Sequence, residues 1–117
     1  MTDDCQPFAS DCAVRLATDL LAHTWDPVVL LALRLGGRRR SDLLAEVGGI
    51  SDKVLSETLR RLSANGLLTR TVTSEGRAVV YELSELGGSL ANGPMAALGE
   101  WAVAHGDEVL AAQQARG

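Results

Sequence analysis

Cysteine is scarce in this sequence: the 117 residues hold only Cys5 and Cys12, and the two histidines, His23 and His105, are isolated. Two cysteines so close together cannot form the disulfide framework of a small secreted domain, and no His/Cys cluster has the spacing of zinc ligands. Hydrophobic residues make up 46% of the chain, which has the size of one domain with a single core. We therefore expect a single globular domain without a metal or cofactor.

Long apolar runs are also missing. The longest, Pro27 to Leu33, is closed by Arg34 and falls far short of the roughly 18 residues of a membrane span. The first residues, Met1 to Cys5, are acidic where a signal peptide would be basic. These features predict a cytoplasmic protein with no membrane partner.

The motifs of common enzymes are absent as well. The sequence has no P-loop, no Rossmann glycine pattern and no metal-binding motif. Serine, histidine and aspartate all occur, but in no recognisable nucleophile elbow or triad setting. We predict that the protein is not an enzyme.

Charge is unevenly distributed along the chain. The formal net charge is -4, yet residues 34–77 contain nine basic and five acidic side chains, so this segment carries +4 and the two flanks together carry -8. A basic centre between acidic ends is typical of a DNA-facing module held by acidic packing helices.

Helical periodicity and capping signals dominate the first half of the chain. Residues 1–10 show little periodicity and are expected to form a flexible arm. Asp11 is expected to cap the first helix, Asp26 the second, with Pro27 at its first turn, and Ser51 the fourth. Val54, Leu55, Thr58, Leu59 and Leu62 would form the inner stripe of that fourth helix, with Lys53, Ser56, Glu57, Arg60 and Arg61 pointing outward. The predicted helices are residues 12–23, 27–35, 41–47 and 52–65.

The hydrophobic period then changes from 3.6 to 2. Residues 67–73 and 78–83 are β-prone and are joined by turn-forming residues, which predicts a β-hairpin. Ser84 can cap a further helix that Gly93-Pro94 would break, and a last helix is expected over 95–113. The fold class is thus mainly α with a small antiparallel β-hairpin, a winged helix-turn-helix over residues 11–117 with helical dimerisation elements at both ends.

Several runs of this sequence resemble the HxlR family of transcriptional regulators, which is related to MarR-type winged helices. The runs are CAV at 12–14, Trp25, GISDKVLS at 49–56, LRRL at 59–62, NGLL at 65–68 and VYELSELG at 80–87. The resemblance implies a homodimer with one recognition helix per subunit in the major groove of a pseudo-palindromic operator. The sequence departs from the family pattern at Arg40, where an aromatic residue is common, and at Glu57, where an uncharged polar residue is common.

The candidate DNA-binding residues lie in the basic centre. Lys53, Ser56 and Arg60 share one face of the predicted recognition helix, where cations and hydroxyls suit phosphates and base edges. Glu57 would be unfavourable near phosphates unless it pairs with Arg61 or accepts a hydrogen bond from a cytosine amine. The full set of predicted DNA contacts is Arg38, Arg39, Arg40, Ser51, Lys53, Ser56, Glu57, Arg60 and, at the hairpin tip, Arg77.

The acidic flanks are expected to build the dimer. The residues predicted to meet across a two-fold axis are Leu16, Leu20 and Leu21 of the first helix with Met95, Leu98 and Trp101 of the last. Cys12 lies near a helix start, which favours thiolate chemistry, so a thiol-based redox-sensing regulator is one alternative. The other is a winged-helix module that binds only proteins. Both regulator hypotheses, with and without redox sensing, allow a small-molecule or oxidant effector, which the sequence does not identify.

Overall fold

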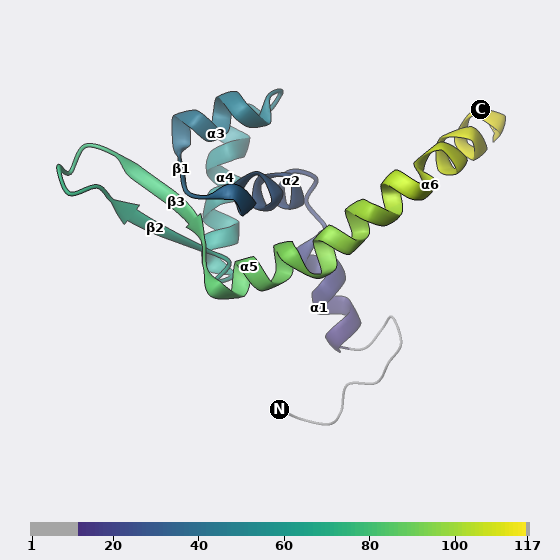
Figure 1. Cartoon of the computed structure of the whole chain (residues 1–117), viewed down its shortest axis with the longest axis horizontal. Coiled ribbons are helices and arrows are strands. Elements are labelled where there is room, and N and C mark those ends of the chain that lie inside the picture. The colour runs from purple at the N-terminus through teal and green to yellow at the C-terminus, as the bar shows by residue number, and fades with distance from the viewer. Residues whose placement is uncertain (1–11, 117) are drawn as a thin grey trace.

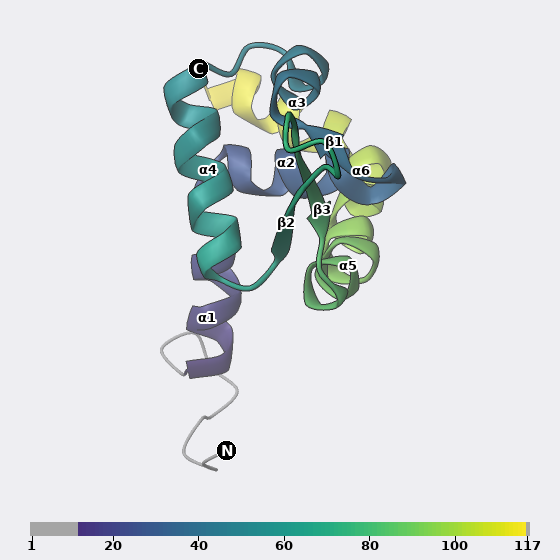
Figure 2. The same ribbon diagram turned by 90° about the vertical axis from the view of Figure 1, so that its left-hand side faces the viewer.

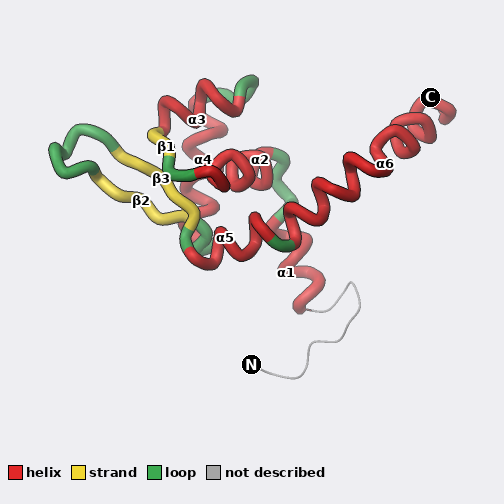
Figure 3. Tube along the Cα trace, viewed as in Figure 1, coloured by secondary structure: helices red, strands yellow, loops and turns green. Residues whose placement is uncertain are grey.

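The computed structural model describes residues 12–116. The predictions for the arm at residues 1–10 and for Asp11 as a helix cap lie outside these residues. Figures 1 and 3 show a cluster of helices from which the hairpin of one small sheet projects, with a long helix leading to the C-terminus. The elements are α1 (Cys12–Leu20), α2 (Trp25–Ala32), the 3-10 turn η1 (Leu33–Leu35), β1 (Arg38–Arg39), α3 (Arg40–Val47), α4 (Asp52–Ala64), β2 (Leu68–Val72), β3 (Val79–Leu83), α5 (Glu85–Asn92) and α6 (Pro94–Arg116).

The hydrophobic core lies between α2, α3, α4 and the sheet. The inner stripe predicted for α4 is confirmed, since Leu55, Thr58, Leu59 and Leu62 are buried and Val54 is half-buried. Branched and linear apolar side chains of the other elements complete this core. They are Val29, Leu30, Leu33, Leu43, Ile50, Leu67, Leu68 and Met95.

The sheet has one strand more than expected. The predicted hairpin is confirmed as β2 and β3, which pair antiparallel, but β1 pairs with the other edge of β3, so the strand order is β1-β3-β2. In this register Arg38 lies opposite Tyr81 and Arg39 opposite Val80. A strand of two residues shows no alternating pattern, which is why the sequence pattern did not reveal it.

Both predicted serine caps are confirmed. The Ser51 side chain accepts a hydrogen bond from the Val54 backbone amide at 3.1 Å, and Ser84 accepts one from Gly87 at 2.9 Å. Each bond satisfies one of the free amides at a helix start. The prediction that Asp26 caps α2 is wrong: the helix begins at Trp25, and Asp26 is buried inside the domain.

The last two helices meet at Gly93, as the Gly93-Pro94 break predicted. Beyond the break, α6 runs for 23 residues and projects from the body, so that the C-terminus and the hairpin lie at opposite ends of the molecule (Figure 1). Met95 is the buried residue of α6. From Ala97 to Arg116, every residue but the half-buried Gly106 is exposed.

Within residues 12–116, no single helix is long and apolar enough to cross a membrane. The helices Ala13–Leu20 and Trp25–Leu35 reach the required length and composition only when taken together, and they are bent by 76°. Val29, Leu30 and Leu33 of the second segment belong to the hydrophobic core described above.

Candidate nucleic-acid interface

The turn between α3 and α4 sets up the candidate recognition helix. Gly48 and Gly49 both have positive φ angles, +68° and +78°, a backbone conformation that suits glycine. Ile50 then enters the core, and Ser51 caps α4. Figure 2 shows α4 and the hairpin side by side on one side of the molecule, with α3 next to the start of α4. This is the helix-turn-helix arrangement with an adjoining wing.

A hydrogen-bond network joins the starts of α3 and α4. The Arg40 guanidinium donates to the Asp52 carboxylate at 2.7 Å, to the Asp52 carbonyl at 2.8 Å and to the Ser56 hydroxyl at 2.6 Å. The Ser56 oxygen therefore already accepts from Arg40, while its own proton remains available to donate. Arg40, whose side chain is 36% exposed, thus fixes the two helices relative to each other at the predicted interface.

The other predicted contacts on α4 differ in exposure. Lys53 and Arg60 are exposed, and Glu57 is half-buried beside them. Ser51 is exposed but uses its oxygen as the helix cap. The structure therefore brings Lys53, Ser56, Glu57 and Arg60 to one side of α4, as their spacing predicted.

A cleft separates α4 from the sheet. It has a volume of about 350 Å³ and is lined by residues of α3, α4, β2 and β3. Arg70, on β2, lies opposite Tyr81 on β3 and was not among the predicted site residues. The polar residues that line the cleft are Arg40, Ser56, Arg60, Ser63, Arg70 and Tyr81.

Arg38 does not fit the role of phosphate clamp that we expected. Its guanidinium donates to Glu46 at 2.9 Å and to the carbonyls of Gly36 and Gly37 at 3.3 and 3.1 Å. These bonds tie the strand β1 to α3, so the side chain stabilises the domain itself. Arg39, in contrast, is exposed on the same strand.

Arg77 lies in the turn at the tip of the hairpin, where it is exposed. The turn is closed by the Thr73 amide, which donates to the Ala78 carbonyl at 2.8 Å, and Gly76 adopts a φ of +70°. An exposed guanidinium at a wing tip can reach a phosphate or a narrow minor groove.

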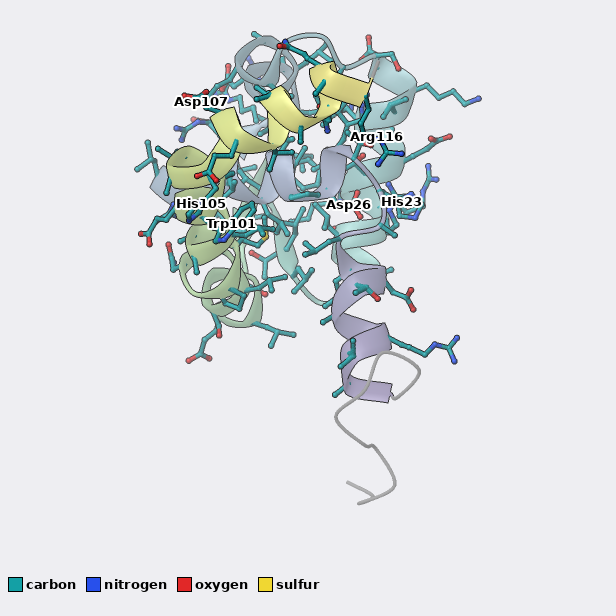
Figure 4. The ribbon with its side chains drawn as sticks, turned by 90° about the vertical axis from the view of Figure 1, so that its right-hand side faces the viewer. His23, Asp26, Trp101, His105, Asp107 and Arg116 are labelled. Atoms are coloured by element: carbon teal, nitrogen blue, oxygen red, sulfur yellow. The ribbon has the colours of Figure 1, made fainter. Side chains whose placement is uncertain are left out.

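An ion pair between Arg61 and the buried Asp26 joins α4 to α2. The Arg61 Nε and Nη2 atoms each donate to one carboxylate oxygen of Asp26 at 2.9 Å. The bond to Asp26 raises the pKa of the Arg61 guanidinium, and the nearby negative charge of Glu57 adds a smaller effect in the same direction. The expectation that Arg61 points outward is therefore corrected, because it joins α4 to α2. Asp26 is labelled in Figure 4, where it lies on α2 inside the helical part of the molecule.

The predicted dimer residues fall into two groups. Leu16, Leu98 and Trp101 are exposed by 62, 53 and 55%, and Trp101 packs against His105 with ring centroids 4.9 Å apart and ring planes tilted by 39° (Figure 4). Leu20 and Leu21 are half-buried against the core. Met95 is 3% exposed and packs in the subunit's own core, so the expectation that it faces a partner is wrong. The side chain of Cys12 lies outside the described part of the structure.

Comparisons with known proteins agree on one family. The family described as HxlR-like helix-turn-helix matches residues 20–109. The HTH-type transcriptional regulator YtfH of Escherichia coli K12 is 34% identical over 110 residues, which are 93% of this chain and 86% of that protein.

Solved structures show the same arrangement of elements. The structure of the transcriptional regulator ytfH from Salmonella typhimurium has a TM-score of 0.75 and 32% identity, and the match covers 95% of this chain and 99% of that one. The regulator YodB of Bacillus subtilis in its reduced form has a TM-score of 0.70 and 28% identity, over 77% of this chain and 88% of that one. YodB has also been solved bound to a quinone, with a TM-score of 0.67 and 28% identity, over 77% of this chain and 93% of that one.

Proposed function

The chain belongs to the HxlR-like helix-turn-helix family and is a DNA-binding transcriptional regulator rather than an enzyme; we propose that it acts as a homodimer on a pseudo-palindromic operator. One observation supports operator binding: Lys53, Ser56 and Arg60 lie on the same side of α4, beside the exposed hairpin. A regulator of this kind works where the chromosome is, so we expect it in the cytoplasm.

The proposed DNA contacts follow from exposure and position. α4 enters the major groove with Lys53, Ser56, Glu57 and Arg60, while Arg77 reaches the backbone or the adjacent minor groove. Arg39 and the Ser51 hydroxyl lie at the margin, within reach of phosphates, and Arg40 acts by holding Ser56 in place. Arg38 is left out of this set because its donors are engaged within the domain.

The proposed dimer is supported by apolar surface that has no cover in a single subunit. The exposed Leu98 and Trp101 of α6 and Leu16 of α1 are large side chains that water solvates poorly. Two copies related by a two-fold axis would cover these side chains and present two recognition helices one helical turn of DNA apart.

Selection of bound duplexes from a random pool tests operator binding. We expect the recovered sites to contain two inverted half-sites about 10 base pairs apart, centre to centre. The protein should bind the selected duplex at least a thousandfold more tightly than a random duplex at the same salt concentration. Recovery of sites without inverted symmetry, or equal affinity for both duplexes, would contradict the proposal.

A redox-sensing mode is the second candidate. It is supported by YodB, whose structures include a reduced and a quinone-bound form, and by the start of α1 at Cys12, because a helix start favours a thiolate. On treatment with a mild oxidant or a quinone, operator affinity should fall for the wild type and not for Cys12→Ser. If both proteins respond equally, Cys12 is not the sensor.

A further inference from the structure

We propose that the cleft between α4 and the sheet is a phosphate site that holds one phosphodiester of the DNA backbone, with Arg60 and Arg70 as its cationic walls. The proposal rests on the proposed function and adds to it a site and a residue, Arg70 on β2, that the sequence pattern did not single out.

The lining of the cleft suits a compact anion. Three arginines, two serines and one tyrosine line it, and no aspartate or glutamate does. Ligand pockets for drug-sized molecules are lined mostly by apolar side chains, which this cleft lacks apart from Leu59. The guanidinium group presents paired N–H donors that match the oxygens of a phosphate.

Two of the three arginines have no counter-charge. Arg40 is paired with Asp52, but within residues 12–116 neither Arg60 nor Arg70 lies within 4.0 Å of a carboxylate oxygen. Like charges that face the same cleft repel each other, and an anion between them removes that repulsion. The Ser56 hydroxyl, whose oxygen accepts from Arg40, keeps a proton to donate to the same anion.

The position of the cleft matches the path of the DNA backbone. Arg60 lies on α4, which is proposed to enter the major groove, and Arg70 lies on β2, part of the hairpin proposed to reach the adjacent minor groove. One sugar–phosphate strand always separates a major groove from the neighbouring minor groove. That strand must pass between α4 and the hairpin, which Figure 2 shows side by side, and the cleft opens between these elements.

The test compares Arg70→Gln with the wild type on two probes, the selected duplex and a random 30-base-pair duplex. A phosphate contact contributes equally to both, so affinity should fall about tenfold on each duplex. The slope of log affinity against log salt concentration should become shallower by about 1. Arg70→Lys keeps the charge and should retain the slope while losing part of the affinity.

Arg116→Gln is the matched control, because it removes the same charge at the far end of α6 (Figure 1). It should leave the slope and both affinities unchanged. The unfolding midpoint of Arg70→Gln in urea should equal that of the wild type, since Arg70 is exposed on β2. A lowered midpoint together with unchanged DNA binding would give Arg70 a structural role and overturn the proposal.

Four further outcomes would overturn the phosphate site. Unchanged affinity and slope for Arg70→Gln on both duplexes removes Arg70 from the interface and leaves the proposed function standing. A loss confined to the selected duplex makes Arg70 a reader of bases. Inorganic phosphate could also shift the side-chain NMR signals of Arg60 and Arg70 and saturate this shift at low-millimolar concentration. If the slope of log affinity against log salt concentration is then unchanged in Arg70→Gln, the cleft binds a free anion instead of the DNA backbone. If the wild type binds neither duplex, the proposed function itself fails, and the site fails with it.

Discussion

Asp26 and Arg61 form the most deeply placed charged pair in the described part of the molecule. The Asp26 side chain is 2% exposed and that of Arg61 is 30% exposed, and two hydrogen bonds of 2.9 Å join them. The carboxylate is removed from water, and among the described residues the Arg61 guanidinium is the group that hydrogen-bonds to it. The pair fixes the rotation of α4 relative to α2, and with it the direction in which the DNA-facing side chains point.

Removing the Asp26 charge should destabilise the domain. We expect Asp26→Asn to lower the free energy of unfolding by about 2 kcal/mol, because it leaves a half-buried guanidinium without its partner. Urea unfolding followed by tryptophan fluorescence measures this. Asp52→Asn is the control, since the Asp52 side chain is 71% exposed and its pair with Arg40 should contribute less than about 1 kcal/mol. Equal losses in the two variants would mean that burial of Asp26 does not matter.

The raised pKa of Arg61 also has a consequence for pH. Because the folded state binds this proton more tightly than the unfolded state, the stabilisation is fully present below the ordinary pKa of arginine. It is lost only as the pH rises through the folded pKa. Arg61 should therefore contribute the same stability throughout the neutral range, and its titration should matter only in strongly alkaline solution.

Glu57 is an acidic residue on the DNA-facing side of α4. We considered an ion pair with Arg61 or a hydrogen bond from a cytosine amine. The structure does not show the first, since the direct partner of Arg61 is Asp26. We predict that Glu57→Gln binds random DNA several-fold more tightly, because a negative charge near phosphates is lost. The same variant should relax the preference at one base pair of the selected site. Fluorescence anisotropy on both duplexes measures the two effects, and tighter binding without a change in preference would exclude contact with a base.

At the scale of the element, α5 depends on a glycine at its contact with the sheet. A Cβ atom on Gly87 would lie 1.9 Å from the Leu67 carbonyl oxygen, far inside van der Waals contact. The helix approaches the start of β2 this closely because Ser84 and the hairpin hold it there: the Ser84 amide donates to Leu67 and its hydroxyl to Gly66.

Gly87→Ala should therefore lower the free energy of unfolding by about 3 kcal/mol, since backbone must move to admit the methyl group. Gly88→Ala is the matched control on the same helix, because its Cβ would meet only the end of the Asn92 side chain at 3.9 Å. That control should be unchanged or up to about 1 kcal/mol more stable, as expected for alanine in a helix. Thermal unfolding decides between the two effects, and a neutral Gly87→Ala would disprove the close contact.

The elements were largely predictable because their signals are local. Serines at 51 and 84 cap α4 and α5, and the change of period marks the hairpin, so caps and periodicity located both features. The family motifs pointed to the same fold, which the comparisons confirm. The prediction failed where the outcome depends on a partner distant in the chain. Asp26-Pro27 has the composition of a helix start, but Arg61 lies 35 residues away and takes the carboxylate.

The candidate site was predictable in part for the same reason. The helical spacing of Lys53, Ser56 and Arg60 placed them on one side of α4. The spacing could not reveal that Arg38 turns inward to Glu46, because β1 exists only through pairing with β3. Nor could it bring Arg70 next to Arg60, since the cleft that unites them depends on how the sheet packs against α4.

At the scale of the whole molecule, the exposed apolar residues of α6 control the proposed assembly. We predict that Trp101→Asp converts the dimer to monomers and abolishes operator binding, because a carboxylate would have to be buried against the partner. Sedimentation equilibrium measures the mass. Leu35→Asp is the control: Leu35 is a large apolar residue of η1 that is 88% exposed and is not among the residues of the proposed contact, and the variant should remain dimeric. A dimeric Trp101→Asp with native affinity would rule out this interface.

The joint at Gly93 also governs the reach of the assembly. α6 is roughly 34 Å long at 1.5 Å per residue, and among the described residues Met95 is its buried anchor, one residue past the helix start. A change of about 10° at such a joint turns the recognition helix by the same angle relative to the dimer contact proposed at Leu98 and Trp101, and so changes the separation of the two recognition helices. A series of duplexes that differ only in half-site separation would then measure the angle between α5 and α6 in solution, because the separation that is bound most tightly depends on this angle.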